Sequence, residues 1–180
     1  MDGGPRVGEK LGRQVDGVSC GPAVLVVTAA LTGSGRSGPA TARSGAARST
    51  GGTSLGAAQH LAHRQANRLW PRALGTTPWG MRAWLHRHAP AAGGFRIRPA
   101  TAGVLAVVPS APVPVPLLIG SRWLPRHWVL VTGLADDGRW QVYEPGAGVV
   151  RAFDPRTFDD GTAAAVLGRP RPWCVLLPSG

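Results

Sequence analysis

The sequence predicts an α+β fold, in which helices come first along the chain and an antiparallel sheet follows. Two observations lead to this prediction. Before residue 90, apolar residues recur at helical spacing and two prolines stand where a helix would begin. After residue 94, the apolar runs are short, rich in β-branched residues and separated by turn residues, and two of them are typical of a β-hairpin.

The chain has 180 residues, of which 43% are hydrophobic, and this suits one domain with a buried core. We predict an N-terminal lead-in over residues 1–12 and a single domain over residues 13–180. Within that domain, residues 32–53 are rich in Gly, Ser, Ala and Arg, which is typical of a flexible loop.

Three segments of the first half are predicted to be helices. Residues 22–31 are apolar and open with a proline, whose missing N–H costs nothing in the first helical turn. Residues 54–69 carry Leu and Ala on one helical face. We expect Thr77 to cap a third helix, which ends before Pro90.

About five strands are predicted in the second half. The apolar or alternating runs that supply them are residues 95–99, 103–109, 115–120, 127–134, 139–143, 149–153 and 173–178.

The hairpin made by residues 127–134 and 139–143 allows a register to be predicted. If four residues form its loop, Leu134 pairs with Arg139 and Glu144 lies opposite Val129. Glu144 then shares a sheet face with His127 and is its diagonal neighbour, about 7–8 Å away at the backbone. A two-residue turn at Asp137-Gly138 would keep the face but place the pair further apart, and a bulge would then be needed.

One of the two cysteines, Cys20, stands just before the first predicted helix. The helix N-terminus favours negative charge, so a thiolate placed there would be a nucleophile. Such a nucleophile needs a base and an oxyanion hole. His127 is the one histidine that begins a predicted core strand, Glu144 could orient it from the neighbouring strand, and Gln14 could donate a side-chain N–H to the oxyanion.

These motifs follow one another in an order that resembles the papain-like cysteine peptidases. More narrowly, the order is similar to that of the bacteriocin-processing, double-glycine leader peptidase family, without its transporter segments. The resemblance covers about residues 13–178 and is carried by Gln14, Cys20-Gly21-Pro22-Ala23, His127-Trp128-Val129 and Glu144-Pro145-Gly146.

The resemblance implies a papain-like fold, with the nucleophile helix in an N-terminal helical half and an antiparallel sheet in the C-terminal half. It implies a thiol hydrolase that cleaves a peptide or amide bond of a peptide or protein substrate. In that enzyme Cys20 is the nucleophile, His127 the general base and Gln14 part of the oxyanion hole. Glu144 stands where the family usually has Asp or Asn, which is a departure, and Asp154 is the alternative third member.

Three other functions stay open. An acyltransferase would use the same thiol, and a catalytically inactive binding protein could share the fold. A basic nucleic-acid-binding module would use the net charge of +11, but the arginines are scattered singly, so nucleic acid is not the expected partner.

We expect no cofactor and no metal. His60 and His63 are one helical turn apart, but two ligands are fewer than zinc normally takes. Cys174 lies in an apolar run and is expected in the core. No apolar run is long enough to span a bilayer and no secretion signal is visible, so we expect a cytoplasmic protein, with leaderless export left open. The sequence does not set the oligomeric state.

Overall fold

A computed structural model of the chain describes residues 4–33, 54–67 and 70–179. The predicted loop over residues 32–53 therefore lies outside the described residues, apart from its first two, which end a helix.

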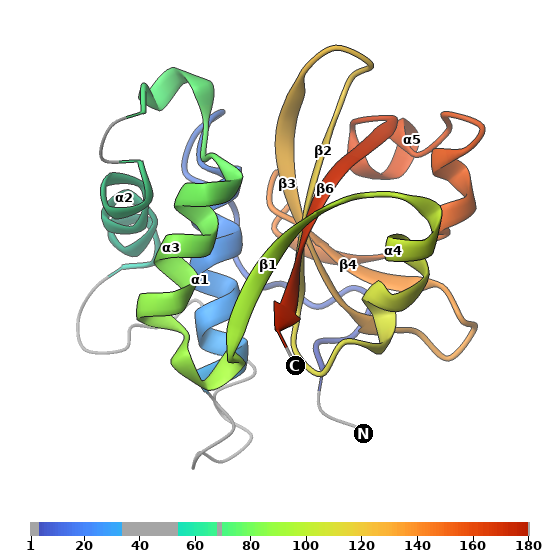
Figure 1. The fold of residues 1–180 in the computed structure, drawn as a ribbon, viewed down its shortest axis with the longest axis horizontal. Coiled ribbons are helices and arrows are strands. Elements are labelled where there is room, and N and C mark those ends of the chain that lie inside the picture. Colours follow the sequence, from blue (N-terminus) through green and yellow to red (C-terminus); the bar gives the residue numbers. More distant parts are fainter. Residues whose placement is uncertain (1–3, 34–53, 68–69, 180) are drawn as a thin grey trace.

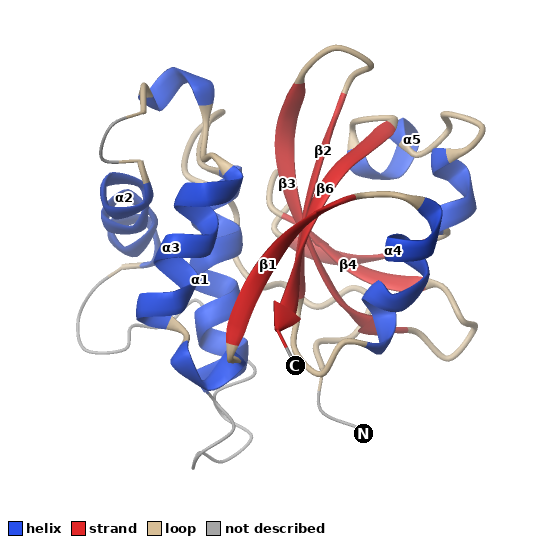
Figure 2. Ribbon diagram, viewed as in Figure 1, coloured by secondary structure: helices blue, strands red, loops and turns tan. Residues whose placement is uncertain are grey.

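Helices lie on both sides of a central sheet (Figures 1 and 2). The three longer helices pack together on one side, and two short helices lie on the other. The α-helices are α1 (Cys20–Gly33), α2 (Leu55–Ala66), α3 (Pro78–His88), α4 (Ala102–Val107) and α5 (Ala164–Leu167). Short 3₁₀ helices span Arg72–Leu74, Pro90–Ala92, Val108–Ser110 and Pro155–Phe158.

The sheet has six antiparallel strands in the order β1-β6-β2-β3-β4-β5. The C-terminal strand is inserted between the first and second strands, which ties the two ends of this half of the chain together. The strands are β1 (Gly94–Pro99), β2 (Val115–Gly120), β3 (Pro125–Leu134), β4 (Trp140–Glu144), β5 (Val149–Phe153) and β6 (Arg171–Ser179).

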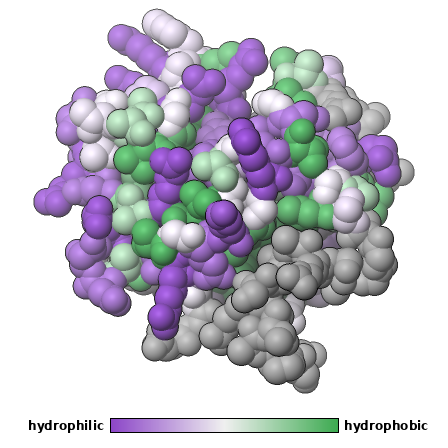
Figure 3. Space-filling view, turned by 180° about the vertical axis from the view of Figure 1, so that it is seen from behind, coloured by the Kyte–Doolittle hydropathy of each residue, from purple (hydrophilic) through white to green (hydrophobic). Residues whose placement is uncertain are grey.

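Each face of the sheet has its own apolar core. On β3, Trp128 and Leu130 belong to the core shared with the long helices, whereas Val129 and Val131 belong to the core beneath the short helices. This alternation is what a strand buried on both faces requires. On the outer surface seen from behind, apolar residues lie in small groups between hydrophilic ones (Figure 3), as on most folded domains.

Residues 8–11 run along the exposed edge of β5. The backbone N–H of Gly8 donates to the Val150 carbonyl at 2.9 Å, and the N–H of Leu11 donates to the Gly148 carbonyl at 3.0 Å. Leu11 is buried beneath this contact. The segment covers an edge that would otherwise present unpaired backbone groups, and it leads the chain directly to Gln14.

The helix predictions are confirmed, including the cap at Thr77, whose hydroxyl accepts the Gly80 N–H at 3.0 Å. The strand predicted over residues 103–109 is wrong, because that run forms α4 and a 3₁₀ turn. The Thr101 side chain caps α4 by accepting the Val104 N–H, and this local cap favours a helix over the β-branched composition. The other six runs all form strands, one more than the predicted number.

The predicted hairpin register is wrong at the turn and right near the site. Leu134 pairs with Trp140 rather than Arg139, because the loop holds one more residue than predicted. A bulge between Val131 and Gly133 then compensates for that residue. Leu130 consequently pairs with Tyr143, and this register continues to a diagonal relation between His127 and Glu144.

Candidate active site

Cys20 is the first residue of α1, so its thiol lies at the helix N-terminus. A loop carboxylate fixes this end of the helix. Asp16 accepts the Val18 N–H at 3.0 Å and the Ser19 hydroxyl through the same oxygen. Cys20 is 3% exposed, and its Sγ lies 3.9 Å from the Arg126 carbonyl oxygen, immediately before His127 on β3.

Close packing between α1 and β3 brings the helix end to the sheet. A Cβ on Gly21 would lie 2.5 Å from the Thr76 side chain, so only glycine fits there. The Trp128 indole donates to the Thr76 carbonyl at 2.8 Å. Two residues of the short motifs, Gly21 of α1 and Trp128 of β3, therefore have a structural reason to be there, because both pack against Thr76.

Three of the predicted site residues come together between α1, β3 and β4. His127 Nε2 lies 2.8 Å from Glu144 Oε1, and the Cys20 thiol is near enough to the His127 ring to raise its pKa. The imidazole therefore lies beside both the cysteine and the glutamate.

Glu144 reaches the imidazole from a turn that holds its carboxylate. Oε1 also accepts the Gly146 N–H at 2.8 Å, and Oε2 accepts the Ala147 N–H at 2.7 Å. A Cβ on Gly146 would lie 3.0 Å from Oε1, so glycine leaves room for the longer side chain. The turn therefore holds the carboxylate of Glu144 against the imidazole, as the sequence analysis predicted for this residue.

The pKa values of the two partners move in opposite directions. Burial by itself would lower the pKa of His127, but hydrogen bonds and charge from Cys20 and Glu144 raise it from 6.5 to about 9. Burial would raise the pKa of Glu144, but the hydrogen bonds from His127 and the two backbone N–H groups lower it overall. A charged imidazole beside a charged carboxylate is the favoured state at neutral pH.

Gln14 lies on the segment that passes beneath this turn. Its backbone N–H donates to the Pro145 carbonyl at 2.9 Å, next to Glu144 in the chain. Its side-chain Nε2 donates to the Asp16 carbonyl at 2.7 Å, which fixes the amide in the loop leading to Cys20. A side-chain amide carries two N–H groups, so this bond leaves one free to donate.

Gln59, which the sequence analysis did not single out, holds the backbone on both sides of Gln14. Its Oε1 accepts the Val15 N–H at 3.1 Å and its Nε2 donates to the Arg13 carbonyl at 3.0 Å. Gln59 is 1% exposed on α2. Nothing local in the sequence marks it, because its partners are more than 40 residues away.

Two candidates from the sequence lie apart from this cluster. Asp154 caps a 3₁₀ helix and forms an ion pair with Arg156 at 2.7 Å, so it is bound elsewhere. Cys174 is a free, partly buried thiol on β6, and burial raises its pKa to about 11. Among the residues described, no three His, Cys, Asp or Glu side chains gather as metal ligands. In the same part of the chain, no helix has the length and hydropathy needed to cross a bilayer.

The fold is that of a papain-like peptidase domain. Among solved structures, the chain is similar to the peptidase domain of Streptococcus ComA, a bi-functional ABC transporter involved in a quorum-sensing pathway. The match covers 95% of this chain and 99% of that domain, with a TM-score of 0.52 and 19% sequence identity. The predicted α+β papain-like fold is thereby confirmed. No family model matches the sequence, and no curated protein does.

Proposed function

We propose that the protein is a thiol hydrolase that cleaves a peptide or amide bond through Cys20, His127, Glu144 and Gln14. The observation that supports this most is the position of the His127 ring, which lies 2.8 Å from Glu144 and near enough to the Cys20 thiol for the thiol to raise its pKa. Nucleophilic catalysis needs a nucleophile, a base beside it and an acceptor that orients the base.

In the first half of the proposed reaction, the Cys20 sulfur attacks the substrate carbonyl carbon and forms a C–S bond. The carbonyl electron pair moves to oxygen, where the free Gln14 N–H and the Cys20 backbone N–H stabilise the oxyanion. Because Nε2 of His127 faces Glu144, the other ring nitrogen faces the reacting atoms. It gives its proton to the leaving amine as the C–N bond breaks.

In the second half, His127 takes a proton from water, and the resulting hydroxide attacks the thioester carbonyl. The C–S bond breaks and the sulfur leaves with its electron pair, which restores the starting pair. Glu144 keeps the imidazole oriented through both halves and stabilises its charged form whenever it carries the proton, and its own turn N–H groups keep the carboxylate in place.

A catalytically inactive binding protein is the second candidate. The low exposure of Cys20 and the use of Gln14 Nε2 by the Asp16 carbonyl favour it, since both reduce what is offered to a substrate. The two candidates differ in one measurable property, which is cleavage that depends on the thiol.

The test is digestion of a diverse peptide library, with new peptide ends identified by mass spectrometry. The wild type and Cys174→Ser are expected to create the same new ends, whereas Cys20→Ser creates none. Ends that persist in Cys20→Ser would show a contaminating peptidase. A folded wild type that creates no ends, over a library covering all residue pairs, would support the inactive binding protein.

A further inference from the structure

A cavity of about 410 Å³ opens beside the His127–Glu144 pair. Its other walls are Arg151 of β5 and residues 164–169, which form α5 and the turn after it. Cys20 is not part of the lining. A group bound in the cavity would therefore touch the imidazole and leave the thiol open to the scissile carbonyl.

The imidazole identifies which part of a substrate would enter the cavity. In the proposed reaction His127 gives its proton to the leaving amine, so the atoms next to His127 belong to the portion of the peptide that follows the scissile bond. The cavity is therefore placed to bind the leaving-group portion of the peptide rather than the acyl portion.

The cavity wall carries positive charge that the protein does not neutralise. The Nε of Arg151 is buried and has no hydrogen-bond partner among the described residues. Arg169 adds a second guanidinium, whereas the charge of the His127 imidazole is balanced by its ion pair with Glu144. The carboxylate of the wall, Glu144, already accepts three hydrogen bonds.

Arg151 is near Glu144 without being its partner. Val142 pairs with Arg151 across β4 and β5, and Glu144 lies two residues further along the same strand, which makes the two charged residues diagonal neighbours. Within the described chain no ion pair joins them. A half-buried guanidinium that faces a cavity and lacks a carboxylate is suited to a carboxylate ligand, because its planar N–H fork matches two carboxylate oxygens.

We propose that this cavity binds a carboxylate on the leaving-group side of a peptide substrate, with Arg151 as its main partner and Arg169 as a second. The proposal rests on the proposed function, because it takes Cys20 and His127 as the reacting pair. The carboxylate can come from an Asp or Glu side chain after the scissile bond or from the C-terminus of the peptide.

The test uses alkylating probes that place a carboxylate beyond Cys20. In each probe the sulfur attacks an iodoacetyl CH₂, a C–S bond forms and iodide leaves with the bonding pair. N-iodoacetyl-glycine carries a terminal carboxylate and N-iodoacetyl-aspartate amide a side-chain carboxylate. N-iodoacetyl-glycinamide and N-iodoacetyl-asparagine amide are their neutral matches. The readout is the ratio of labelling rates within each pair, at pH 7 and low salt.

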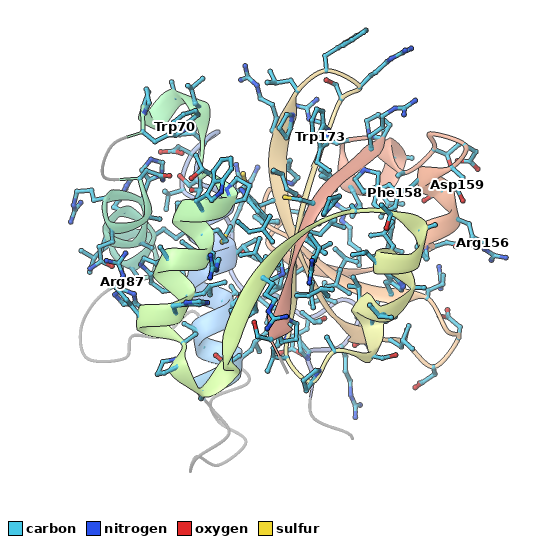
Figure 4. All side chains as sticks on the ribbon, in the orientation of Figure 1. Trp70, Arg87, Arg156, Phe158, Asp159 and Trp173 are labelled. Carbon is cyan, nitrogen blue, oxygen red and sulfur yellow. The ribbon has the colours of Figure 1, made fainter. Side chains whose placement is uncertain are left out.

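We expect at least one carboxylate probe to label Cys20 about tenfold faster than its neutral match, as a charge-assisted hydrogen bond allows. The pair that shows the effect identifies the source of the carboxylate. Arg151→Gln should bring the ratio to within about twofold of one, and Arg151→Lys should keep part of it. The matched control is Arg156→Gln, since Arg156 lies at the outer edge of the sheet half (Figure 4), paired with Asp154.

Charged-to-neutral rate ratios near one in the wild type, or the same ratio in Arg151→Gln as in the wild type, would overturn the proposal. Fast labelling by the neutral probes would in either case still support Cys20 and His127 as the reacting pair. Failure of the neutral probes would count against the proposed function instead. In that case N-acetyl-glycine and N-acetyl-aspartate amide are titrated against their neutral matches, N-acetyl-glycinamide and N-acetyl-asparagine amide, while the His127 ring signals are followed by NMR. Equal affinity within both pairs would then overturn the carboxylate site on its own.

Discussion

Replacing Glu144 by Gln tests whether its carboxylate is what holds the imidazole charged. The substitution keeps the size of the side chain and an oxygen for His127, but it removes the negative charge. In the wild type the Ala147 N–H donates to Glu144 Oε2 at 2.7 Å, and the substitution places an NH₂ group opposite that donor. An opposite charge at hydrogen-bonding distance raises a histidine pKa by roughly 1–3 units.

The pKa of His127 is therefore expected to fall from about 9 to roughly 7.5 in Glu144→Gln, because the contacts with Cys20 remain. A fall of that size corresponds to about 2 kcal/mol of lost preference for the charged ring. NMR titration of the ring signals measures it directly. Asp154→Asn is the matched control, since that acid binds Arg156 and should leave the His127 pKa unchanged.

The same variant has a signature in stability. Folding lowers the pKa of Glu144 below its ordinary value of 4.5, so the carboxylate stabilises the fold above that pH and loses this effect as the pH falls through the folded pKa. Denaturant unfolding should show Glu144→Gln less stable by about 1–2 kcal/mol at pH 7. The difference should shrink below pH 4. A His127 pKa within half a unit of the wild type, or an equal shift in Asp154→Asn, would refute the reasoning.

Two further predictions concern the proposed oxyanion hole. A peptide aldehyde forms an adduct with Cys20 that carries the oxyanion oxygen, so its affinity should fall about 100-fold in Gln14→Ala. The rate of labelling by iodoacetamide should change less than threefold in the same variant. Equal losses in both measurements would place Gln14 outside the oxyanion hole. Gln59→Leu removes both backbone bonds around Gln14 and should cost about 2 kcal/mol of stability and about tenfold in aldehyde affinity. Gln65, on the same helix as Gln59, accepts one hydrogen bond from Trp84 of α3. Gln65→Leu should therefore lower stability alone, and an aldehyde loss equal to that of Gln59→Leu would argue against a positioning role.

The fold could be predicted where local chemistry decides the structure. The cap at Thr77, the proline that follows it at the start of α3 and the alternation along the strands are all local signals, which act within a few residues. The run over residues 103–109 misled the prediction, because its composition favours a strand while the cap at Thr101 starts a helix. A bulge near Gly133 altered the hairpin register for a related reason, since an inserted residue leaves the hydrophobic alternation on either side intact.

The residues of the candidate site likewise divide into those that local sequence motifs predict and those that only the folded structure reveals. The order of the short motifs was enough to nominate Cys20, His127 and Glu144. Gln59 and Arg151 could not be found in this way, because their significance depends on partners brought near only by the folded chain. In the sequence, a glutamine on a helix and an arginine on a strand are indistinguishable from ordinary surface residues. The structure shows that Gln59 binds the backbone on both sides of Gln14 and that Arg151 lines the cavity beside His127.

The most direct test of the central claim is the rate of iodoacetamide labelling of the native protein between pH 5 and 9, with the modified cysteine mapped. Cys174 is an internal reference, because its pKa of about 11 keeps it unreactive over most of this range. If His127 and Cys20 form an activated pair, Cys20 is labelled rapidly at pH 6, and His127→Ala slows this about 100-fold. Slow labelling of Cys20 that rises only near pH 8.5, where an ordinary thiol ionises, and that is unchanged in His127→Ala would contradict the account.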